Sequence, residues 1–456
     1  MSRPGICAAR LRAALLVCCL VAPADLLAAD RLLGTVGEVT SSGAVIWARG
    51  ARPGPITIRL THPGAQAGTG GVIDATRTDD LTGKVALSGL TPGTAYAYRL
   101  ESGAEVATGA FVTAPHRDEA ARVAFLWSGD LGGAGLCRRL DGGYPIFRAM
   151  ARHRPDFFLF VGDTIYADRR CDGPGTVPGA NFVATSLREF RERHRYNRED
   201  PAVQELFRTT SVYAIWDDHE VRNDFAGPTE PLMVTGRRAF LEYWPLRPPP
   251  EEPSRMYRKF RWGRLLEIFI LDTRQYRSPN TQPDGPGKTM LGPPQRRWLV
   301  ENVTTSTALW KVVVSSVPLA IPTGRPERRD SWSNANVYGI PQGNGTGFAT
   351  ERDAILAQLR ERGTRNLVFL TADVHYAELI QHHPAPAFSL HEFVAGPLSA
   401  SLGRPRPLDE GLSPRSLFAV GGVNTFGEVT IEPARLTVRI VDESGSVLGT
   451  HTLTPE

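Results

Sequence analysis

The chain of 456 residues has few cysteines, five in all, and little net charge: 52 basic and 48 acidic side chains leave +4. Balanced charge and a hydrophobic fraction of 41% exclude an intrinsically disordered chain. The slight basicity is too weak to indicate a nucleic-acid partner, and the lack of a basic stripe with interleaved aromatic residues argues against a nuclease. Beyond the first 29 residues no apolar run approaches the roughly 20 residues of a transmembrane helix. The sequence therefore predicts a globular protein without a membrane span in that region.

The first 29 residues have the layout of a secretory signal peptide. Three arginines precede an apolar run at 13–22, and small residues follow up to Ala29. A membrane-anchoring amphipathic helix is the alternative interpretation. We expect cleavage after Ala29, with Ala24 as the second choice, and a secreted or periplasmic mature protein.

Three of the five cysteines fall in this segment, which leaves Cys137 and Cys171. In an oxidising compartment such a pair can form one disulfide. The alternative is that Cys137 lies near a metal centre. The sequence leaves both interpretations open.

Residues 30–115 predict a small all-β module. Strand-length runs with alternating apolar residues are separated by turn residues, which is typical of a β-sandwich. The strands are expected at 44–48, 56–60, 95–100 and 109–113. The stretch 90–99 resembles the corner before a late strand in fibronectin type III modules. Tyr96 and Tyr98 are then core or corner residues.

Residues 116–456 alternate apolar runs with helical segments. A strand at 123–127, a helix at 144–151 and a strand at 157–161 form a βαβ unit whose sheet is buried on both faces. Further strands are predicted at 211–216, 265–271, 310–316, 366–371 and 390–395, helices at 293–302 and 351–362, and a hairpin at 428–441 that closes a sheet edge. Thr350 and Asp353 suggest a capping box for the second of these helices.

Four of these strands end in acidic residues: Asp130, Asp163, Asp218 and Asp373. The carboxyl ends of the strands of an α/β sheet face one crevice, so the four side chains are expected to converge. A single aspartate in such a place is usually a helix cap or a turn former. Four converging carboxylates would repel one another, and metal ions are the simplest compensation. The set therefore predicts a metal site.

Five motifs resemble the PhoD-like branch of the calcineurin-like metallophosphoesterases. They are Gly-Asp-Thr-Ile-Tyr at 162–166, Trp-Asp-Asp-His-Glu-Val at 216–221, Leu-Asp-Thr-Arg-Gln-Tyr at 271–276, Leu-Gly-Pro-Pro-Gln at 291–295 and Thr-Ala-Asp-Val-His at 371–375. The resemblance covers nearly the whole mature chain. It implies a four-layer α/β/β/α catalytic domain at 116–456, behind a fibronectin type III-like β-sandwich. It also implies two metals between facing sheets and hydrolysis of phosphate esters by water activated at those metals.

The resemblance also implies roles for single residues. Asp163 would bridge the metals, Asp130 and Tyr166 would complete one site, and the further ligands would be Asp218, Asp373 and His375. His219 would stay off the metals and act on the leaving oxygen. Asn223 and Arg222 are the candidates for substrate binding, with Arg169 and Arg195 as further phosphate clamps.

Four charged neighbours of these motifs receive structural interpretations. Asp217 and Glu220 are expected to support His219 and the residues around it. Asp272 and Arg274 are expected to form a pair that holds their loop.

The donor set predicts hard cations. Many relatives have a cysteine at the first strand end, where this chain has Asp130, so His375 is the one ligand that is not an oxygen donor. Such a set suits Ca²⁺, Mg²⁺, Mn²⁺ or Fe³⁺. The resemblance implies Ca²⁺ with Fe³⁺, and Mn²⁺ or Mg²⁺ are the alternatives.

The leading hypothesis is an exported, monomeric alkaline phosphatase or phosphodiesterase that hydrolyses small-molecule phosphate esters for phosphate scavenging. The motifs do not choose between monoesters and diesters. A non-catalytic surface or adhesion protein is the competing hypothesis, and the loss of a core ligand would favour it. Every matching ligand position is filled.

Overall fold

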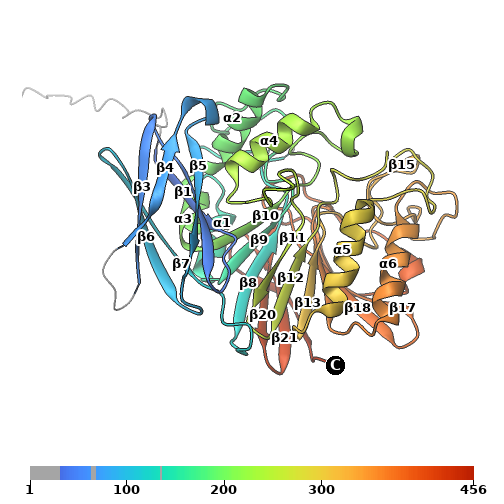
Figure 1. The fold of residues 1–456 in the computed structure, drawn as a ribbon. Helices are drawn as coiled ribbons and strands as arrows, with labels where there is room; N and C mark the ends of the chain where they lie inside the picture. The colour runs from blue at the N-terminus through green and yellow to red at the C-terminus, as the bar shows by residue number, and fades with distance from the viewer. Residues whose placement is uncertain (1–30, 63–67, 134–135) are drawn as a thin grey trace, which may run out of the picture.

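The computed structural model describes residues 31–62, 68–133 and 136–456. Two large mixed sheets form the centre of the described part (Figure 1). The first consists, in spatial order, of β22 (Val447–Leu453), β21 (Arg435–Asp442), β20 (Thr425–Glu432), β8 (Val123–Ser128), β9 (Phe157–Val161), β10 (Ser211–Ile215), β1 (Leu33–Gly37), β2 (Gly43–Arg49) and β5 (Thr82–Ser88). The second consists of β11 (Arg258–Trp262), β12 (Leu266–Ile270), β13 (Trp310–Val314), β16 (Leu367–Thr371), β18 (Phe388–Val394), β17 (Ala377–Ala385) and β19 (Pro414–Val420).

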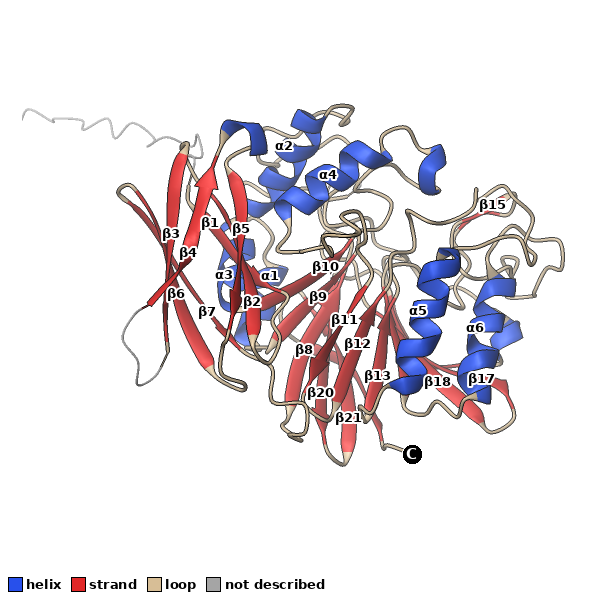
Figure 2. Cartoon of the chain, viewed as in Figure 1, coloured by secondary structure: helices blue, strands red, loops and turns tan. Residues whose placement is uncertain are grey.

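Helices flank this pair of sheets (Figure 2). They are α1 (Ile146–Arg152), α2 (Leu187–Arg198), α3 (Pro201–Thr209), α4 (Met233–Tyr243), α5 (Gly292–Thr305) and α6 (Ala349–Glu361). Helices α1 and α3 pack on the first sheet and α5 and α6 on the second. This order of layers agrees with the α/β/β/α arrangement expected for residues 116–456.

The central strands are apolar on both faces because each lies between a sheet and a helix layer. Phe157 of β9 contacts Trp262 of β11 with ring centroids 4.7 Å apart, whereas Phe160 contacts Phe207 of α3. Successive side chains of β12 likewise face opposite layers. Ile268 belongs to the core between the sheets, and Phe269 packs with the α5 and α6 side chains. Burial of each such side chain contributes about 1.5–3 kcal/mol.

The N-terminal strands predicted from the sequence are present, and they lie in two sheets, one of which is continuous with the first large sheet. The strands β4 (Gly68–Ala75), β3 (Gly54–Thr61), β6 (Ala95–Ser102) and β7 (Glu105–Val112) form a sheet of their own. The strands β1, β2 and β5 instead extend the first large sheet, because β1 pairs in parallel with β10. The predicted domain boundary between residues 115 and 116 stays a prediction.

Tyr96 and Tyr98 are core or corner residues, as predicted. Both are buried, and the Tyr96 hydroxyl accepts a hydrogen bond from the backbone N–H of Thr91, five residues earlier. The Tyr98 hydroxyl donates to the carbonyl of Arg208 in α3. The second bond ties the N-terminal strands to α3.

Two predictions, one about the start of a helix and one about the edge of a sheet, are wrong. Helix α6 begins after Phe348, so Thr350 lies inside it and no side chain caps it. The Thr350 N–H donates instead to Asp284, which a distant loop supplies. The hairpin of β20 and β21 exists, but β22 forms the sheet edge outside it, and β20 pairs with β8.

The predicted signal peptide lies outside the described residues. Of the helices that the structure describes, none is long and apolar enough to cross a membrane.

Candidate active site

The acidic strand ends meet at one edge of the sheet pair. Asp130 follows β8, Asp163 follows β9, Asp218 follows β10, and Asp373 and His375 follow β16. Four of these five residues have φ between 50° and 72° (Asp218 does not), a conformation that is uncommon outside glycine and concentrated at functional sites. The turn after β9 also needs glycine, because a Cβ at position 162 would stand 2.5 Å from the Asp217 Cβ.

Asp130, Asp163 and His375 form the first candidate ligand group, with ligand atoms within 4.8 Å of one another. The His375 Nδ1 lies 2.7 Å from the Ser401 carbonyl oxygen, which can only accept, so Nδ1 carries a proton and Nε2 keeps its lone pair. Burial lowers the pKa of His375 to about 4. The ring is therefore neutral at pH 7, the form that binds metals.

Tyr166 stands beside this group. Its hydroxyl lies 3.0 Å from the His375 Nε2, and its ring stacks on His219 with centroids 4.1 Å apart. A Cβ at Gly133 would stand 2.4 Å from the Tyr166 ring, so only glycine fits there. Burial, reinforced by the charges of Asp163 and Asp130, raises the pKa of Tyr166 well above its usual value. The phenol therefore stays protonated unless a cation replaces its proton.

The second candidate ligand group consists of Asp163, Asp218 and His219. Asp163 belongs to both groups, which is the position of a bridging carboxylate. The resemblance puts His219 off the metals, yet its ring lies close enough to be counted in this group. The His219 Nδ1 is engaged by Asp168 at 2.7 Å. Burial alone would lower the pKa of His219, but the carboxylates of Asp218 and Asp168 outweigh it and raise the pKa to about 9.

The donors fit bound cations. Burial, reinforced by neighbouring carboxylates, raises the pKa of Asp130, Asp163 and Asp373 well above the usual range. One oxygen each of Asp130, Asp218 and Asp373 is buried and has no hydrogen-bond partner among the residues that the structure describes. Cations at these oxygens would remove both costs. Carboxylates, a phenol and a single imidazole are donors for hard cations.

A third acidic group consists of Asp218, Asp224 and Asp330, and the last two did not stand out in the sequence. Asp330 accepts hydrogen bonds from Arg274, Arg277 and Asn280 at 2.7–2.9 Å. Burial opposes ionisation here, but the two guanidinium groups prevail and hold the pKa of Asp330 below its usual range. The guanidinium groups of Arg274 and Arg277 therefore already neutralise most of the negative charge of this acidic group.

The predicted pair of Asp272 and Arg274 exists, but it does not join their side chains. Asp272 holds its loop by accepting from the Trp216 indole at 2.9 Å and from the Arg274 backbone N–H at 3.0 Å. The fully buried Arg274 side chain reaches Asp217 at 2.6 Å and Asp330 at 2.7 Å, and it lies 3.9 Å from Asp218. Arg274 is thus a fixed positive charge behind the ligand groups.

We expect Arg274→Met to destabilise the protein by about 3–5 kcal/mol, because it leaves Asp217 and Asp330 charged, buried and short of a partner. Urea unfolding of the metal-loaded protein measures the loss. The exposed Arg297 of α5 supplies the control, since Arg297→Met should change stability by less than about 0.5 kcal/mol. Equal stability of both variants would contradict the assigned role of Arg274.

Asp217 and Glu220 support the residues around His219, as predicted, rather than the His219 ring itself. Glu220 accepts from the backbone N–H of Thr164 at 2.6 Å and of Asp217 at 2.8 Å, which joins the turns after β9 and β10. The residue that orients His219 is Asp168, which the sequence analysis did not select. The sequence signal that could have identified Asp168 is its position two residues after Tyr166.

The remaining candidates occupy different positions. Within residues 31–62, 68–133 and 136–456, Asp373 is in no ligand group, although one of its oxygens is buried and unpartnered there. The Asn223 backbone N–H donates to Asp168 at 3.0 Å, and the Asn223 amide oxygen accepts from Arg169 at 3.5 Å. Arg222 is half exposed and lies 3.6 Å from Glu230. Arg195 pairs with Glu199 at 3.6 Å, next to the end of α2.

Cys137 and Cys171 form a disulfide. Of the two interpretations that the sequence allowed, the structure has the first, and Cys137 is in no candidate ligand group among the described residues. The bridge joins the loop after Asp130 to the loop after Tyr166. Arg193 reinforces it by donating to the Cys171 sulfur at 3.1 Å and to the Tyr166 carbonyl at 2.6 Å.

The sequence matches a known protein family. The family model for PhoD-like phosphatases matches residues 131–431. Alkaline phosphatase D of Bacillus subtilis (strain 168) is 28% identical over 321 residues, which are 64% of this chain and 52% of the relative. The chain thus spans about half the length of this curated relative.

Two solved structures share the fold. A structure of PhoD superposes with a TM-score of 0.72 at 21% identity, over 92% of this chain and 88% of that one. The purple acid phosphatase PPD1 from yellow lupin (Lupinus luteus) seeds superposes with a TM-score of 0.65 at 12% identity, over 93% and 74%. Since the family model covers well over half of the sequence, the chain belongs to the PhoD-like phosphatases, a metallophosphoesterase-like family.

Proposed function

We propose that this chain hydrolyses small-molecule phosphate esters with the help of two metal ions, as an alkaline phosphatase, a phosphodiesterase or both. The observation that carries the proposal is that Asp163 belongs to two ligand groups, in a site where Asp130, Asp218 and Asp373 each have one buried oxygen without a hydrogen-bond partner among the described residues. Membership of the PhoD-like phosphatases supports it further.

The first metal would be held by Asp130, Asp163, His375 and Tyr166, and the second by Asp163 and Asp218, with Asp373 as a further ligand. The donor set suits hard cations. The resemblance to the family points to Ca²⁺ with Fe³⁺, and Mn²⁺ or Mg²⁺ are the alternatives. When bound, such a pair of cations polarises the phosphate and lowers the pKa of water.

Side chains of the protein would donate the proton and bind the ester. His219 would donate a proton from Nε2 to the leaving oxygen, while Asp168 holds Nδ1 and so fixes the ring. Stacking on Tyr166 restricts the ring further. Asn223 and Arg222 would bind the ester oxygens from the segment that follows His219.

The cellular setting is also a proposal. We infer export to the periplasm or the medium from the first 29 residues, and a role in phosphate scavenging from the location and the chemistry together. The disulfide is in keeping with an oxidising compartment. The expected fibronectin type III-like module, with Tyr96 at its corner, and the monomeric state belong to the same proposal.

The test is hydrolysis of p-nitrophenyl phosphate and bis(p-nitrophenyl) phosphate at alkaline pH, with elemental analysis of the same untreated preparation. We expect turnover with about two metals per chain, lost on chelation and regained with Ca²⁺. The preferred ester identifies the subclass. Failure of reconstituted protein to bind any metal would overturn the proposal.

If Fe³⁺ is the metal beside Tyr166, we expect a visible absorption band from charge transfer between the phenolate and the iron. Tyr166→Phe should lose this band while the protein keeps its fold, because the ring still stacks on His219. Tyr144→Phe is the matched control, since Tyr144 is a buried tyrosine whose hydroxyl donates to the Asn197 amide oxygen at 2.7 Å. A band that survives Tyr166→Phe would exclude Tyr166 as the iron ligand.

A further inference from the structure

The Cys137–Cys171 disulfide joins two loops that start at proposed ligands of the first metal. Cys137 comes seven residues after Asp130, and Cys171 comes five residues after Tyr166. Both cysteines are buried, and they belong to a small apolar cluster that is separate from the two large cores. Loss of the bridge should therefore disturb these two loops more than the fold as a whole.

Arg193 of α2 connects the bridge to Tyr166. Its buried guanidinium donates to the Cys171 sulfur at 3.1 Å and to the Tyr166 carbonyl at 2.6 Å. Gly133, in the loop that leads to Cys137, packs so closely on the Tyr166 ring that a Cβ at this position would stand 2.4 Å from the ring. Tyr166 is thus held at its backbone by Arg193 and at its ring by the other bridged loop.

The loop of Cys137 also contacts the segment that orients His375. The Ser399 hydroxyl donates to the Leu136 carbonyl at 2.6 Å. Ser401, two residues after Ser399, accepts from the His375 Nδ1 at its carbonyl oxygen, at 2.7 Å. The bridged loops therefore contact Tyr166 itself and the segment that fixes His375, which are two of the proposed ligands of the first metal.

Asp218, a proposed ligand of the second metal, is held within its own segment. Its carboxylate accepts from the backbone N–H of Asp224 at 2.6 Å. Asp168 does lie in a bridged loop, but the Asn223 backbone N–H, which donates to it at 3.0 Å, anchors it to that same segment after β10. The bridge is therefore linked more closely to the first metal site than to the second.

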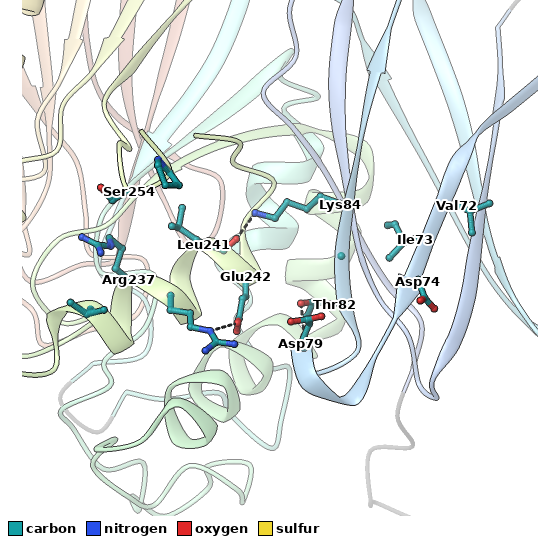
Figure 3. Close-up of a pocket in the computed structure, with 14 residues that line it drawn as sticks. Val72, Ile73, Asp74, Asp79, Thr82, Lys84, Arg237, Leu241, Glu242 and Ser254 are labelled. Carbon is teal, nitrogen blue, oxygen red and sulfur yellow. Dashed lines mark hydrogen bonds and ion pairs between the residues drawn. The ribbon is translucent and has the colours of Figure 1, made fainter. Parts of the chain in front are cut away.

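Other arginines of α2 hold different elements. Arg198, which is also buried, donates to the Tyr243 carbonyl at 3.0 Å and to the Thr35 hydroxyl at 3.1 Å. Arg191 donates at 2.7 Å to Glu242, which lines a groove of about 670 Å³ between β4, β5 and α4 (Figure 3). These contacts join α2 to α4 and β1, and they involve neither of the bridged loops.

We propose that the Cys137–Cys171 disulfide and Arg193 form a positioning clamp for the first metal, so that loss of the bridge weakens the binding of the metal beside Tyr166 and leaves the second metal in place. The inference rests on the proposed function. Groups that orient a ligand without touching the metal typically contribute about 10- to 100-fold to metal affinity. The clamp would contribute in this way by keeping the Tyr166 hydroxyl beside the His375 Nε2, 3.0 Å away.

The test is calorimetric titration of the metal-free protein with Mn²⁺, which measures a dissociation constant for each site. The constant that rises in Tyr166→Phe identifies the first site. We expect Cys137→Ser/Cys171→Ser to raise this constant about tenfold and to leave the second constant unchanged. Arg193→Met, which keeps the bridge, should raise the same constant, and it provides the measurement if the double variant does not fold.

Arg198→Met is the matched control, because it removes a buried arginine of the same helix that holds α4 and β1 instead of the bridged loops. It should lower stability to urea and leave both constants unchanged. The clamp would be overturned if the first constant did not rise in the double variant or in Arg193→Met. Equal increases at both sites, or an increase in Arg198→Met, would also overturn it, because a general loosening of the fold would explain them.

Failure of the proposed function gives a different result. Wild-type protein that binds two metals and hydrolyses neither p-nitrophenyl ester would overturn the catalytic proposal alone, because the titrations still measure the clamp. An active wild type whose first constant is the same in every bridge and Arg193 variant would overturn the clamp alone. Wild-type protein that binds no Mn²⁺ would overturn both.

Discussion

Asp163→Asn is expected to remove metal and activity together. Asp163 is the one residue that belongs to both ligand groups of the proposed pair of metals, so the loss of its charge weakens both sites. Lewis-acid stabilisation by metals is worth several kcal/mol, and each 1.36 kcal/mol is tenfold in rate. We therefore expect turnover of p-nitrophenyl esters to fall by about 10³-fold or more, with fewer than two metals per chain.

The fold should survive this substitution. The amide oxygen of asparagine can still accept the His219 backbone N–H that the Asp163 carboxylate accepts at 3.2 Å. Removing one of several buried carboxylates also relieves their mutual repulsion in the metal-free chain. We therefore expect the metal-free variant to be at least as stable to urea as the metal-free wild type.

The opposite end of the same strand supplies the control. Asp156 precedes β9 and accepts the Ala124 backbone N–H at 2.7 Å. Asp156→Asn keeps an acceptor there and lies far from the ligand groups along the strand, so it should retain metal and activity. An Asp163→Asn protein with two metals and wild-type turnover would refute the bridging role.

The sequence located the strand ends because buried strands have a strong apolar signature. Phe157–Val161 is an unbroken apolar run, and the predicted bounds of that strand match β9. Helix α2 was missed for the opposite reason. Its buried face includes Arg193, His194 and Arg198, so no apolar period marks it.

The residues that support the site were harder to find than its ligands. Arg274 bridges Asp217 and Asp330, which are each more than 50 positions away along the chain. Asp330 follows a two-residue strand rather than a long apolar run. A search for acidic residues at the ends of apolar strands therefore does not find it. Such pairings depend on how loops meet in space, which periodicity does not encode. The proposed ligands were predictable because each follows a recognisable strand.

His219→Ala is expected to lose turnover while keeping both metals. A positioned general acid contributes about 10²–10⁴-fold, and its loss should fall on kcat more than on metal content. Because His219 lies in the second ligand group, metal content is the decisive second measurement. Retention of about two metals supports proton donation, whereas a drop to about one would make His219 a ligand.

The leaving group provides a sharper test of the same role. p-Nitrophenolate is stable without a proton, whereas an alkoxide must be protonated as it leaves. His219→Ala should therefore impair hydrolysis of glycerol 3-phosphate more than that of p-nitrophenyl phosphate. Asp168→Asn should show the same pattern with a smaller loss, because the ring remains but its Nδ1 partner is weakened. If His219→Ala impaired the hydrolysis of both esters to the same degree, relative to the wild type, His219 would be excluded as the proton donor.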